Sequence, residues 1–294
     1  KHGGLRLLPA FADDNVVGGV REYRGKMEAL AGVRSYLEGI RQKHVVLADS
    51  DLIINIPIQD VYQAHIASGA DITAVCTSNV ESDADVTFFR LDESGRVKET
   101  LFPLRDRTGC HRSLEIYILS KELLLNLVDE CLSHDQVSFR GAVLQAKARE
   151  LHIQSYVWDG YAAQIRSVKE YYDRSLELLD PAIRREVFAA GRPIHTKERN
   201  DASTYVDPAG VCCNCLVADG CTIEGTVENS ILFRGVSVAK GAEVKDCILM
   251  QDTTVSRDAV LHHVIADKDV VVKEARTLMG HEHYPMTIVK GSEV

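Results

Sequence analysis

The amino-acid sequence predicts an α/β domain followed by a left-handed parallel β-helix built from hexapeptide repeats. Between residue 43 and about residue 180, short apolar runs of strand type alternate with longer amphipathic runs of helical type. After about residue 205 the helical patterns disappear, and the chain becomes rich in Val, Ile, Gly and Cys. We therefore expect two domains, an α/β domain with a linker at 1–205 and a β-helix domain at 206–294.

The α/β part opens with a strand, a helix and a second strand. Residues 44–48 form a short β-branched run typical of a buried strand, and residues 72–76 form another. Between them, Ile58, Val61 and Tyr62 recur at helical spacing, and Gly69 follows as a stop signal. A unit of this kind builds a parallel sheet. The same reasoning predicts strands at 86–91, 97–101, 114–119 and 153–158, and helices at 121–133, 139–150 and 167–179.

The second half of the chain repeats itself with two periods. Aligning residues 227–233, 244–250 and 261–267 gives an offset of 17, which places Ile231, Ile248 and Ile265 in one phase. A finer period of six runs through small or aliphatic residues, namely Val236, Ala242, Ile248, Thr254, Val260, Ala266 and Val272. A triangular solenoid needs such residues because each short strand sends one side chain toward the axis. The two periods predict a left-handed β-helix over 211–275, and a β-sandwich would not explain both.

Charge and composition exclude several classes of protein. The formal net charge is −9, so the chain lacks the cationic surface that nucleic acid or an anionic membrane would require. No run of 18 apolar residues occurs, which excludes a transmembrane helix, and no signal-peptide pattern opens the chain. Eight cysteines are too few for a disulfide scaffold, so we expect reduced thiols and a cytoplasmic location.

Five short motifs occur in an order that matches one known family. They are Tyr-Arg-Gly-Lys-Met-Glu-Ala at 23–29, Val-Val-Leu-Ala-Asp-Ser-Asp at 45–51, Ser-Leu-Glu-Ile-Tyr-Ile at 113–118, Pro-Ile-His-Thr at 193–196 and Asn-Ser-Ile-Leu at 229–232. Together they resemble the bacterial glucose-1-phosphate adenylyltransferases, which make ADP-glucose for glycogen. The resemblance implies an incomplete Rossmann-like nucleotidyltransferase domain, because the family's glycine-rich ATP loop would precede Lys1.

The sequence departs from the family pattern at the residues that hold the metal and the sugar phosphate in the family. The family's A-G-D aspartate, which holds Mg²⁺, corresponds to Ser50, and its second aspartate, in W-R-D-V-G-T, corresponds to Gln164. A neutral side chain is a poor ligand for a hard cation. The family's F-V-E-K-P segment becomes Thr-Leu-Phe-Pro at 100–103, without its Glu or Lys. The resemblance thus implies Mg²⁺ for the assembled enzyme, no metal ligand or catalytic residue on this chain, and little or no activity for this chain alone.

This pattern resembles the family's regulatory, D-type subunit, which pairs with a catalytic subunit. The resemblance implies a hetero-oligomer, expected to be a tetramer, and a small anionic effector. Residues that could bind such an effector, or only form solvated charge, are Arg21, Arg24, Lys26, Arg184 and Arg185. Two other functions stay open. One is an active sugar-phosphate nucleotidyltransferase with rearranged ligands, and the other is a β-helix scaffold or acyltransferase, which would need a histidine such as His262 or His263.

Four residues are candidates for substrate binding. Asp49 and Asp51 lie at the end of a predicted strand, where open α/β sheets bind ligands. The resemblance places Ser113 and Tyr117 on the sugar-facing strand. Glu115 replaces the family's Gly there, and its carboxylate argues against tight binding of a phosphosugar.

The cysteine cluster and the C-terminal histidines suggest metal sites that their spacing does not support. Adjacent cysteines in a strand point to opposite sides, and a structural zinc site normally pairs two distant C-x-x-C units. We therefore interpret Cys212, Cys213, Cys215 and Cys221 as small coil residues. His281-Glu282-His283 lacks the spacing of H-E-x-x-H, so we expect it to be part of the tail.

Overall fold

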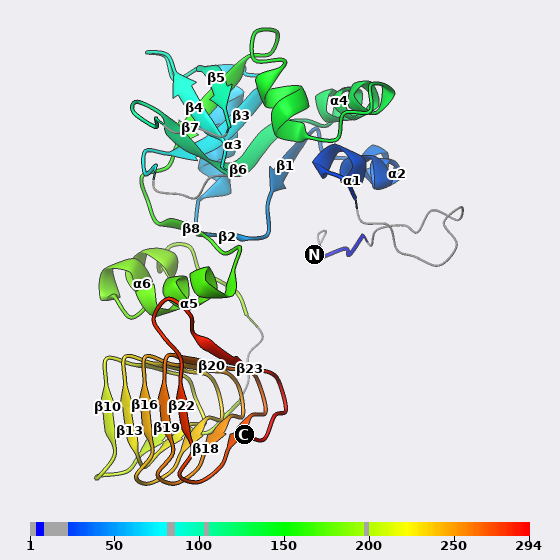
Figure 1. Cartoon of the computed structure of the whole chain (residues 1–294). Coiled ribbons are helices and arrows are strands. Elements are labelled where there is room, and N and C mark those ends of the chain that lie inside the picture. Colours follow the sequence, from blue (N-terminus) through cyan, green and yellow to red (C-terminus); the bar gives the residue numbers. More distant parts are fainter. Residues whose placement is uncertain (1–3, 9–22, 81–85, 103–105, 197–199) are drawn as a thin grey trace, which may run out of the picture. The chain divides into compact units, whose positions relative to one another are not determined.

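The computed structural model describes residues 4–8, 23–80, 86–102, 106–196 and 200–294, and Figure 1 shows its elements. Contacts divide the chain into two compact units. Unit 1 contains Lys1–Ser50 and Ile56–Gly160, and unit 2 contains Asp51–Asn55 and Tyr161–Val294. The coils of the β-helix begin at Tyr205, whereas the unit that holds them already includes the segment from Tyr161. In the described ranges, no helix is both long enough and apolar enough to cross a bilayer.

Unit 1 is built on one six-stranded mixed sheet. Its strands are β1 (His44–Ala48), β3 (Ile72–Thr77), β4 (Phe88–Leu91), β5 (Val97–Leu101), β6 (His111–Ser120) and β7 (Ile153–Val157). The order is β5-β4-β6-β3-β7, with β1 paired antiparallel to β6. The predicted strand–helix–strand unit is confirmed, but β1 and β3 are not neighbours, because β6 pairs with both of them.

The helices of unit 1 are α1 (Lys26–Gly32), α2 (Arg34–Gly39), α3 (Ile58–Ser68) and α4 (Lys121–Ser133), with a π-helical segment η1 (Arg140–Gln145). α4 has the predicted bounds. Ser120 caps it by accepting a hydrogen bond from the Leu123 amide (3.1 Å), and its apolar face is buried in the core through Leu124 and Val128. The regular helix predicted at 139–150 is wrong in type, because the chain forms the wider π turn at 140–145.

Unit 2 begins with a two-stranded antiparallel ribbon, in which β2 (Leu52–Ile54) pairs with β8 (Ala162–Gln164). Two helices follow, α5 (Val168–Glu177) and α6 (Pro181–Val187). The side chains of Ser167 and Asp180 cap them by accepting hydrogen bonds from the amides of Glu170 and Ala182. α5 confirms the helix predicted at 167–179, whereas the sequence patterns did not predict β2 and β8.

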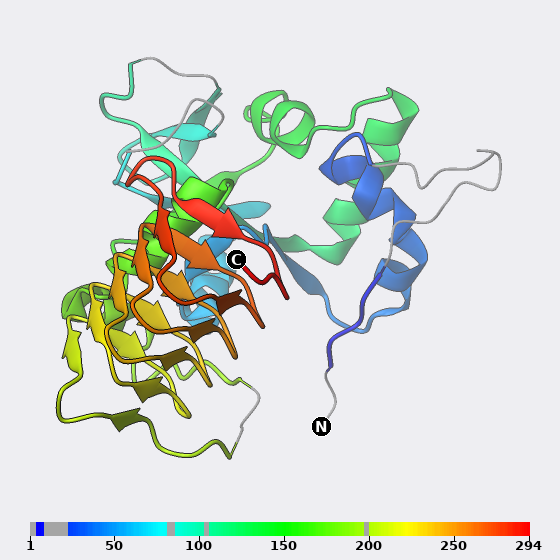
Figure 2. The same cartoon turned by 60° about the horizontal axis from the view of Figure 1, so that its bottom comes forward.

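The rest of unit 2 is a solenoid whose coils stack with three parallel sheets as walls (Figures 1 and 2). The first wall contains β9 (Tyr205–Val206), β12 (Thr222–Ile223), β15 (Ser237–Val238), β18 (Thr254–Val255) and β21 (Val271–Val272). The second contains β10 (Val211–Cys213), β13 (Thr226–Glu228), β16 (Glu243–Lys245), β19 (Val260–His262) and β22 (Thr277–Met279). The third contains β11 (Leu216–Val217), β14 (Ile231–Leu232), β17 (Ile248–Leu249), β20 (Val264–Ala266) and β23 (Met286–Ile288).

The register of the walls follows the repeat seen in the sequence. Ile231 pairs with Ile248, which pairs with Ile265, so the 17-residue offset is one coil. The hexapeptide β-helix is therefore confirmed. At the corner after β13 and β16, Asn229 and Asp246 adopt the left-handed backbone conformation, which Asn and Asp tolerate better than most residues.

Helix α3 buries a histidine against the sheet of unit 1. His65 is 4% exposed, its Nδ1 lies 2.8 Å from the Thr73 hydroxyl, and its ring contacts the His44 ring edge to face. Burial lowers the pKa of His65, and the neighbouring His44 lowers it further. The folded chain therefore resists protonation of a group that the unfolded chain protonates readily.

This lowered pKa predicts acid sensitivity of unit 1. Because the folded-state pKa of His65 lies below the unfolded value of about 6.5, its contribution to stability is complete above that pH. That contribution is lost as the pH falls from about 6.5 through the folded-state pKa. His65→Gln is expected to flatten the decline of the urea midpoint between about pH 7 and about pH 5. The exposed His134→Gln variant serves as the control, and an equal flattening there would contradict this origin.

Candidate functional site

Five side chains from three elements of unit 1 converge at the end of β1. Lys26 lies in the first turn of α1, and Asp49 directly follows β1. Ser113, Glu115 and Tyr117 lie on β6. The antiparallel register, in which Ala48 pairs with Ile116, brings Asp49 beside Glu115. We call these five residues the Lys26 cluster. It contains three of the predicted substrate-binding residues, Asp49, Ser113 and Tyr117.

The members of the Lys26 cluster bind one another. Lys26 Nζ lies 2.7 Å from Asp49 Oδ1 and 3.6 Å from Glu115 Oε2, and it lies over the Tyr117 ring at 5.7 Å from the centroid. Tyr117 donates a hydrogen bond to Glu115 Oε2 (3.0 Å) and lies 3.1 Å from the Ser113 hydroxyl. The Glu115 amide donates to that hydroxyl as well (3.1 Å). The cluster is therefore a closed network of donors and acceptors.

Backbone conformation explains why the network can close. Glu115 has a φ of 53°, in the left-handed region that favours glycine, and this conformation accompanies a break in the β3–β6 register. The family motif has Gly at this position. In this chain the backbone turn at Glu115 directs its carboxylate toward Lys26. Burial raises the pKa of Tyr117 well above its ordinary value, and the Glu115 carboxylate raises it further. The phenol therefore stays protonated and can donate.

The charge of the Lys26 cluster opposes binding of a phosphate group. Two carboxylates, of Asp49 and Glu115, surround the single ammonium of Lys26. An incoming phosphate would have to break both ion pairs and approach two negative charges at short range. The arrangement can hold α1 against the end of β1, and it does not offer an anion site. This outcome agrees with the sequence argument that Glu115 disfavours a phosphosugar.

The carboxylate on the other side of Ser50 also has a cationic partner, in unit 2. Arg166 Nε lies 3.4 Å from Asp51 Oδ2, and its Nη2 donates to Gln164 Oε1 (3.1 Å). The β2–β8 ribbon makes this contact possible, because Leu52 pairs with Gln164 and the Ile165 amide donates to the Asp51 carbonyl (2.8 Å). Arg166 thus bridges Asp51 and the residue that stands at the family's second aspartate.

These residues do not fit a Mg²⁺ site. Mg²⁺ requires a near-octahedral shell of oxygen ligands, normally anchored by carboxylates. Ser50 and Gln164 are neutral, Asp49 is paired with Lys26, and Asp51 shares Oδ2 with the Arg166 guanidinium. Asp51 Oδ1 is buried without a hydrogen-bond partner, but one oxygen beside a guanidinium falls short of that shell. Within the described residues, no group of three or more His, Cys, Asp or Glu side chains could hold a metal.

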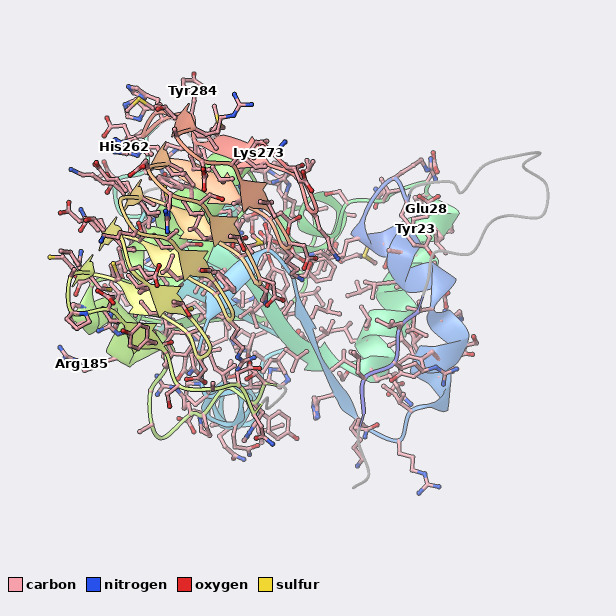
Figure 3. The ribbon with its side chains drawn as sticks, turned by 90° about the horizontal axis from the view of Figure 1, so that it is seen from below. Tyr23, Glu28, Arg185, His262, Lys273 and Tyr284 are labelled. Atoms are coloured by element: carbon pink, nitrogen blue, oxygen red, sulfur yellow. The ribbon has the colours of Figure 1, made fainter. Side chains whose placement is uncertain are left out.

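The predicted effector residues mostly have partners within the chain. Arg24 pairs with Glu28 and with Asp135 (2.8 Å). Arg184 donates to the Leu178 carbonyl (2.9 Å), whereas Arg185 is exposed and extends from the last turn of α6 (Figure 3). Arg21 and the Pro103 end of the 100–103 segment lie outside the described residues.

The candidate histidines of the solenoid serve structural contacts. His262 Nε2 lies 3.0 Å from Glu243 Oε1 on the neighbouring coil. His263 Nδ1 lies 2.9 Å from the Tyr172 hydroxyl, which also donates to the Asp246 carbonyl (2.6 Å) and so fixes α5 on the coils. His281 and Tyr284 form an isolated bridge in the C-terminal segment, and Tyr284 is exposed.

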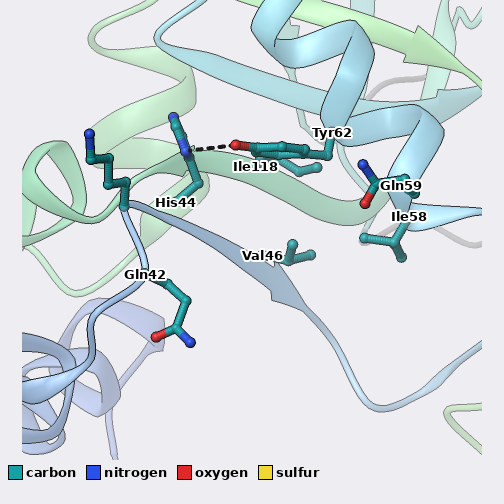
Figure 4. Close-up of a pocket in the computed structure, with 8 residues that line it drawn as sticks. Gln42, His44, Val46, Ile58, Gln59, Tyr62 and Ile118 are labelled. Atoms are coloured by element: carbon teal, nitrogen blue, oxygen red, sulfur yellow. Dashed lines mark hydrogen bonds between the residues drawn. The ribbon is translucent and has the colours of Figure 1, made fainter. Parts of the chain in front are cut away.

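Two cavities were not predicted. One, of about 420 Å³, opens beside β1 and α3 in unit 1 (Figure 4). Its lining is mostly apolar, and one wall is the hydrogen-bonded pair of His44 and Tyr62. The other, of about 650 Å³, lies at a corner of the solenoid, where Lys240 and Arg257 are accompanied by carboxylates. The sequence of β1, His-Val-Val-Leu-Ala, does not alternate, so no sequence signal indicated that Val46 is exposed at the first cavity.

Comparisons with known proteins agree with this architecture. The sequence model of a family described as "GlmU-like, C-terminal hexapeptide" matches residues 202–284. The "Glycogen biosynthesis protein GlgD" of Bacillus subtilis (strain 168) is 33% identical over 87% of this chain and 65% of its own length. The protein of the same name from Geobacillus stearothermophilus is 32% identical, over 83% of this chain and 61% of its own.

A relative that carries the name of an enzyme is also similar to this chain. The "Glucose-1-phosphate adenylyltransferase" of Geobacillus stearothermophilus is 28% identical over 83% of this chain and 64% of its own length. The chain thus spans slightly less than two thirds of the length of these relatives. Similarity to both kinds of protein runs through the α/β part and the solenoid. The chain belongs to the bacterial glucose-1-phosphate adenylyltransferase family and is similar to its GlgD members.

Proposed function

We propose that this chain is the regulatory, catalytically deficient subunit of a glucose-1-phosphate adenylyltransferase that serves glycogen biosynthesis. One observation carries the proposal: both carboxylates that flank Ser50 are already paired with cations of the chain, Asp49 with Lys26 and Asp51 with Arg166. Neither is therefore poised to replace the aspartate that the family places at Ser50. The similarity to two proteins named for glycogen biosynthesis supports the pathway.

The division of labour between subunits follows from the same residues. Adenylyl transfer requires positioning of the phosphates and neutralisation of their charge, which in this family Mg²⁺ supplies when bound. We propose that the catalytic partner holds Mg²⁺ and both substrates. In this chain, Lys26 and Arg166 instead satisfy internal carboxylates and keep the end of β1 and the β2–β8 ribbon in place.

The solenoid offers surfaces through which a hetero-oligomer could assemble. Among the described residues, β9, β10 and β11 each pair with a strand on one side only, so this end of the stack consists of edge strands. Tyr205, Val206 and Val211 are exposed at the same end. We propose a hetero-oligomer, with a tetramer as its expected form, in the cytoplasm, a compartment that suits a chain whose eight cysteines are free.

A mixing experiment tests the regulatory function. The chain and the catalytic subunit of the same organism are purified separately and combined, and ADP-glucose synthesis is followed with and without a small anionic effector, for which inorganic phosphate is the first probe. We expect the mixture to elute as one complex and its apparent affinity for glucose 1-phosphate or for the effector to change by about threefold or more. An equal amount of serum albumin is the control. Separate elution with unchanged kinetics at saturating chain concentration would contradict the proposal.

A further inference from the structure

Cys212 and Cys215 lie on either side of a corner of the first solenoid coil. β10 ends at Cys213, and β11 begins at Leu216. Between them Asn214 adopts the left-handed conformation, with a φ of 50°, so the chain turns sharply within the Cys-Cys-Asn-Cys segment. The turn places Cys212 on one side of this corner and Cys215 on the other, and the Cys215 thiol donates to the carbonyls of Cys213 and Val227 there.

The stacked coils show which way these side chains point. Cys212 pairs in register with Val227, which pairs with Val244, and both valines are completely buried on the solenoid axis. Cys215 comes directly before Leu216, as Ser230 comes before its partner Ile231, and Ser230 is completely buried. Both cysteines therefore face the axis. Cys213 instead pairs with Glu228 on the outer face.

The corner that contains Cys212 and Cys215 lies at the end of the stack of coils, where no further coil in the described ranges covers it. In the described part of the chain, β10 is the outermost strand of its wall (Figure 1), and β11 is the outermost strand of the next. Cys212 is consequently exposed and Cys215 half-buried, although the equivalent residues of later coils are covered. The Cys215 thiol donates to the carbonyls of Cys213 (3.1 Å) and Val227 (3.5 Å). One thiol is thus accessible to solution, and the second is held beside it.

We propose that Cys212 and Cys215 form a reversible intramolecular disulfide, which makes the open end of the solenoid a redox-sensitive corner. A low-molecular-weight disulfide, such as oxidised glutathione, is the oxidant. The Cys212 thiolate attacks it, forms a mixed disulfide and releases one glutathione thiolate. The Cys215 thiolate then attacks Cys212 Sγ and releases the second. The two protein thiols lose two electrons and two protons, and the oxidant becomes two molecules of reduced glutathione.

The surroundings of the two sulfurs set this order of attack. Burial raises the pKa of the Cys215 thiol to about 12, and the nearby Cys212 raises it as well. Cys215 is therefore a poor first nucleophile, whereas Cys212 is accessible to a reagent. Burial likewise raises the pKa of Cys76 and Cys247 to about 12, which keeps these cysteines unreactive in the folded chain.

Thiol counting by mass spectrometry tests the proposal on the full chain. The protein is incubated with oxidised glutathione, denatured, alkylated and mapped by peptides. We expect two of its eight thiols to be lost, a mass decrease of about 2 Da before alkylation, a crosslink between Cys212 and Cys215, and full recovery after dithiothreitol. Cys213→Ser is the matched control, because it removes a neighbouring thiol on the outer face and should leave the crosslink unchanged.

Single variants separate the two steps. Cys215→Ser is expected to trap glutathione on Cys212, and Cys212→Ser to show neither adduct nor crosslink. Circular dichroism shows whether each variant is folded. A crosslink through Cys213, a disulfide between two chains, unchanged thiol counts in the folded protein, or stoichiometric zinc binding that Cys212→Ser abolishes would each overturn the proposal.

Discussion

Assayed alone, the chain is expected to make ADP-glucose from ATP and glucose 1-phosphate at less than about one thousandth of the rate of the Geobacillus stearothermophilus adenylyltransferase. Ser50 and Gln164 lack the negative charge that the family's two aspartates give to the metal, and the Lys26 cluster places two carboxylates around one ammonium. Loss of a metal that stabilises transition-state charge costs about 4 kcal/mol or more, which corresponds to this factor. Release of pyrophosphate in a coupled assay measures the rate.

A second experiment uses the longer Geobacillus enzyme, so its outcome does not depend on the length of the present chain. Serine replaces the A-G-D aspartate of that enzyme, and the activity of the variant is expected to fall by about a thousandfold as well. Turnover by the present chain that is abolished by Asp49→Asn or Asp51→Asn would contradict the prediction, because it would show that a flanking carboxylate has taken over as metal ligand. Arg24→Gln, which removes an exposed charge outside the cluster, is the control for nonspecific loss.

The solenoid was predictable because its sequence signal is repeated. Ile231, Ile248 and Ile265 each occupy the same position in the third wall, so the register follows from counting. Helix α4 was predictable because Ser120 is a strong cap and its apolar face has a clear period. In these segments the local residue pattern and the tertiary packing favour the same structure.

The candidate site depends on contacts that no local pattern contains. Lys26 and Asp49 are 23 positions apart, and both meet Glu115, which lies 66 positions beyond Asp49. The strand end predicted Asp49 and the family resemblance indicated Ser113 and Tyr117, yet neither could show that Lys26 joins them in a closed network. The β2–β8 ribbon was missed because each strand has only three residues, too few for a period to appear.

The second coil also departs from the repeat, and this departure predicts a large effect of one methyl group. The other corners between the first and second walls contain four residues, as between Val238 and Glu243, but only two lie between Ile223 and Thr226. The chain therefore passes close to the next coil. A Cβ on Gly225 would overlap the carbonyl oxygens of Ala242 and Ala239, the latter at 2.7 Å. Gly225→Ala is expected to destabilise unit 2 by about 3 kcal/mol, measured by urea unfolding.

The controls test whether the tight corner, and not the loss of a glycine as such, causes the expected loss of stability in Gly225→Ala. Gly191 also lies in unit 2, but a Cβ there would meet nothing within 4 Å, so Gly191→Ala is expected to be neutral within about 0.5 kcal/mol. Replacing Glu224 and Gly225 by the sequence of the next corner, Ala-Lys-Gly-Ala, restores the normal length and should be tolerated. If Gly225→Ala proves as stable as Gly191→Ala, the second coil can relax and its shortened corner does not constrain the stack.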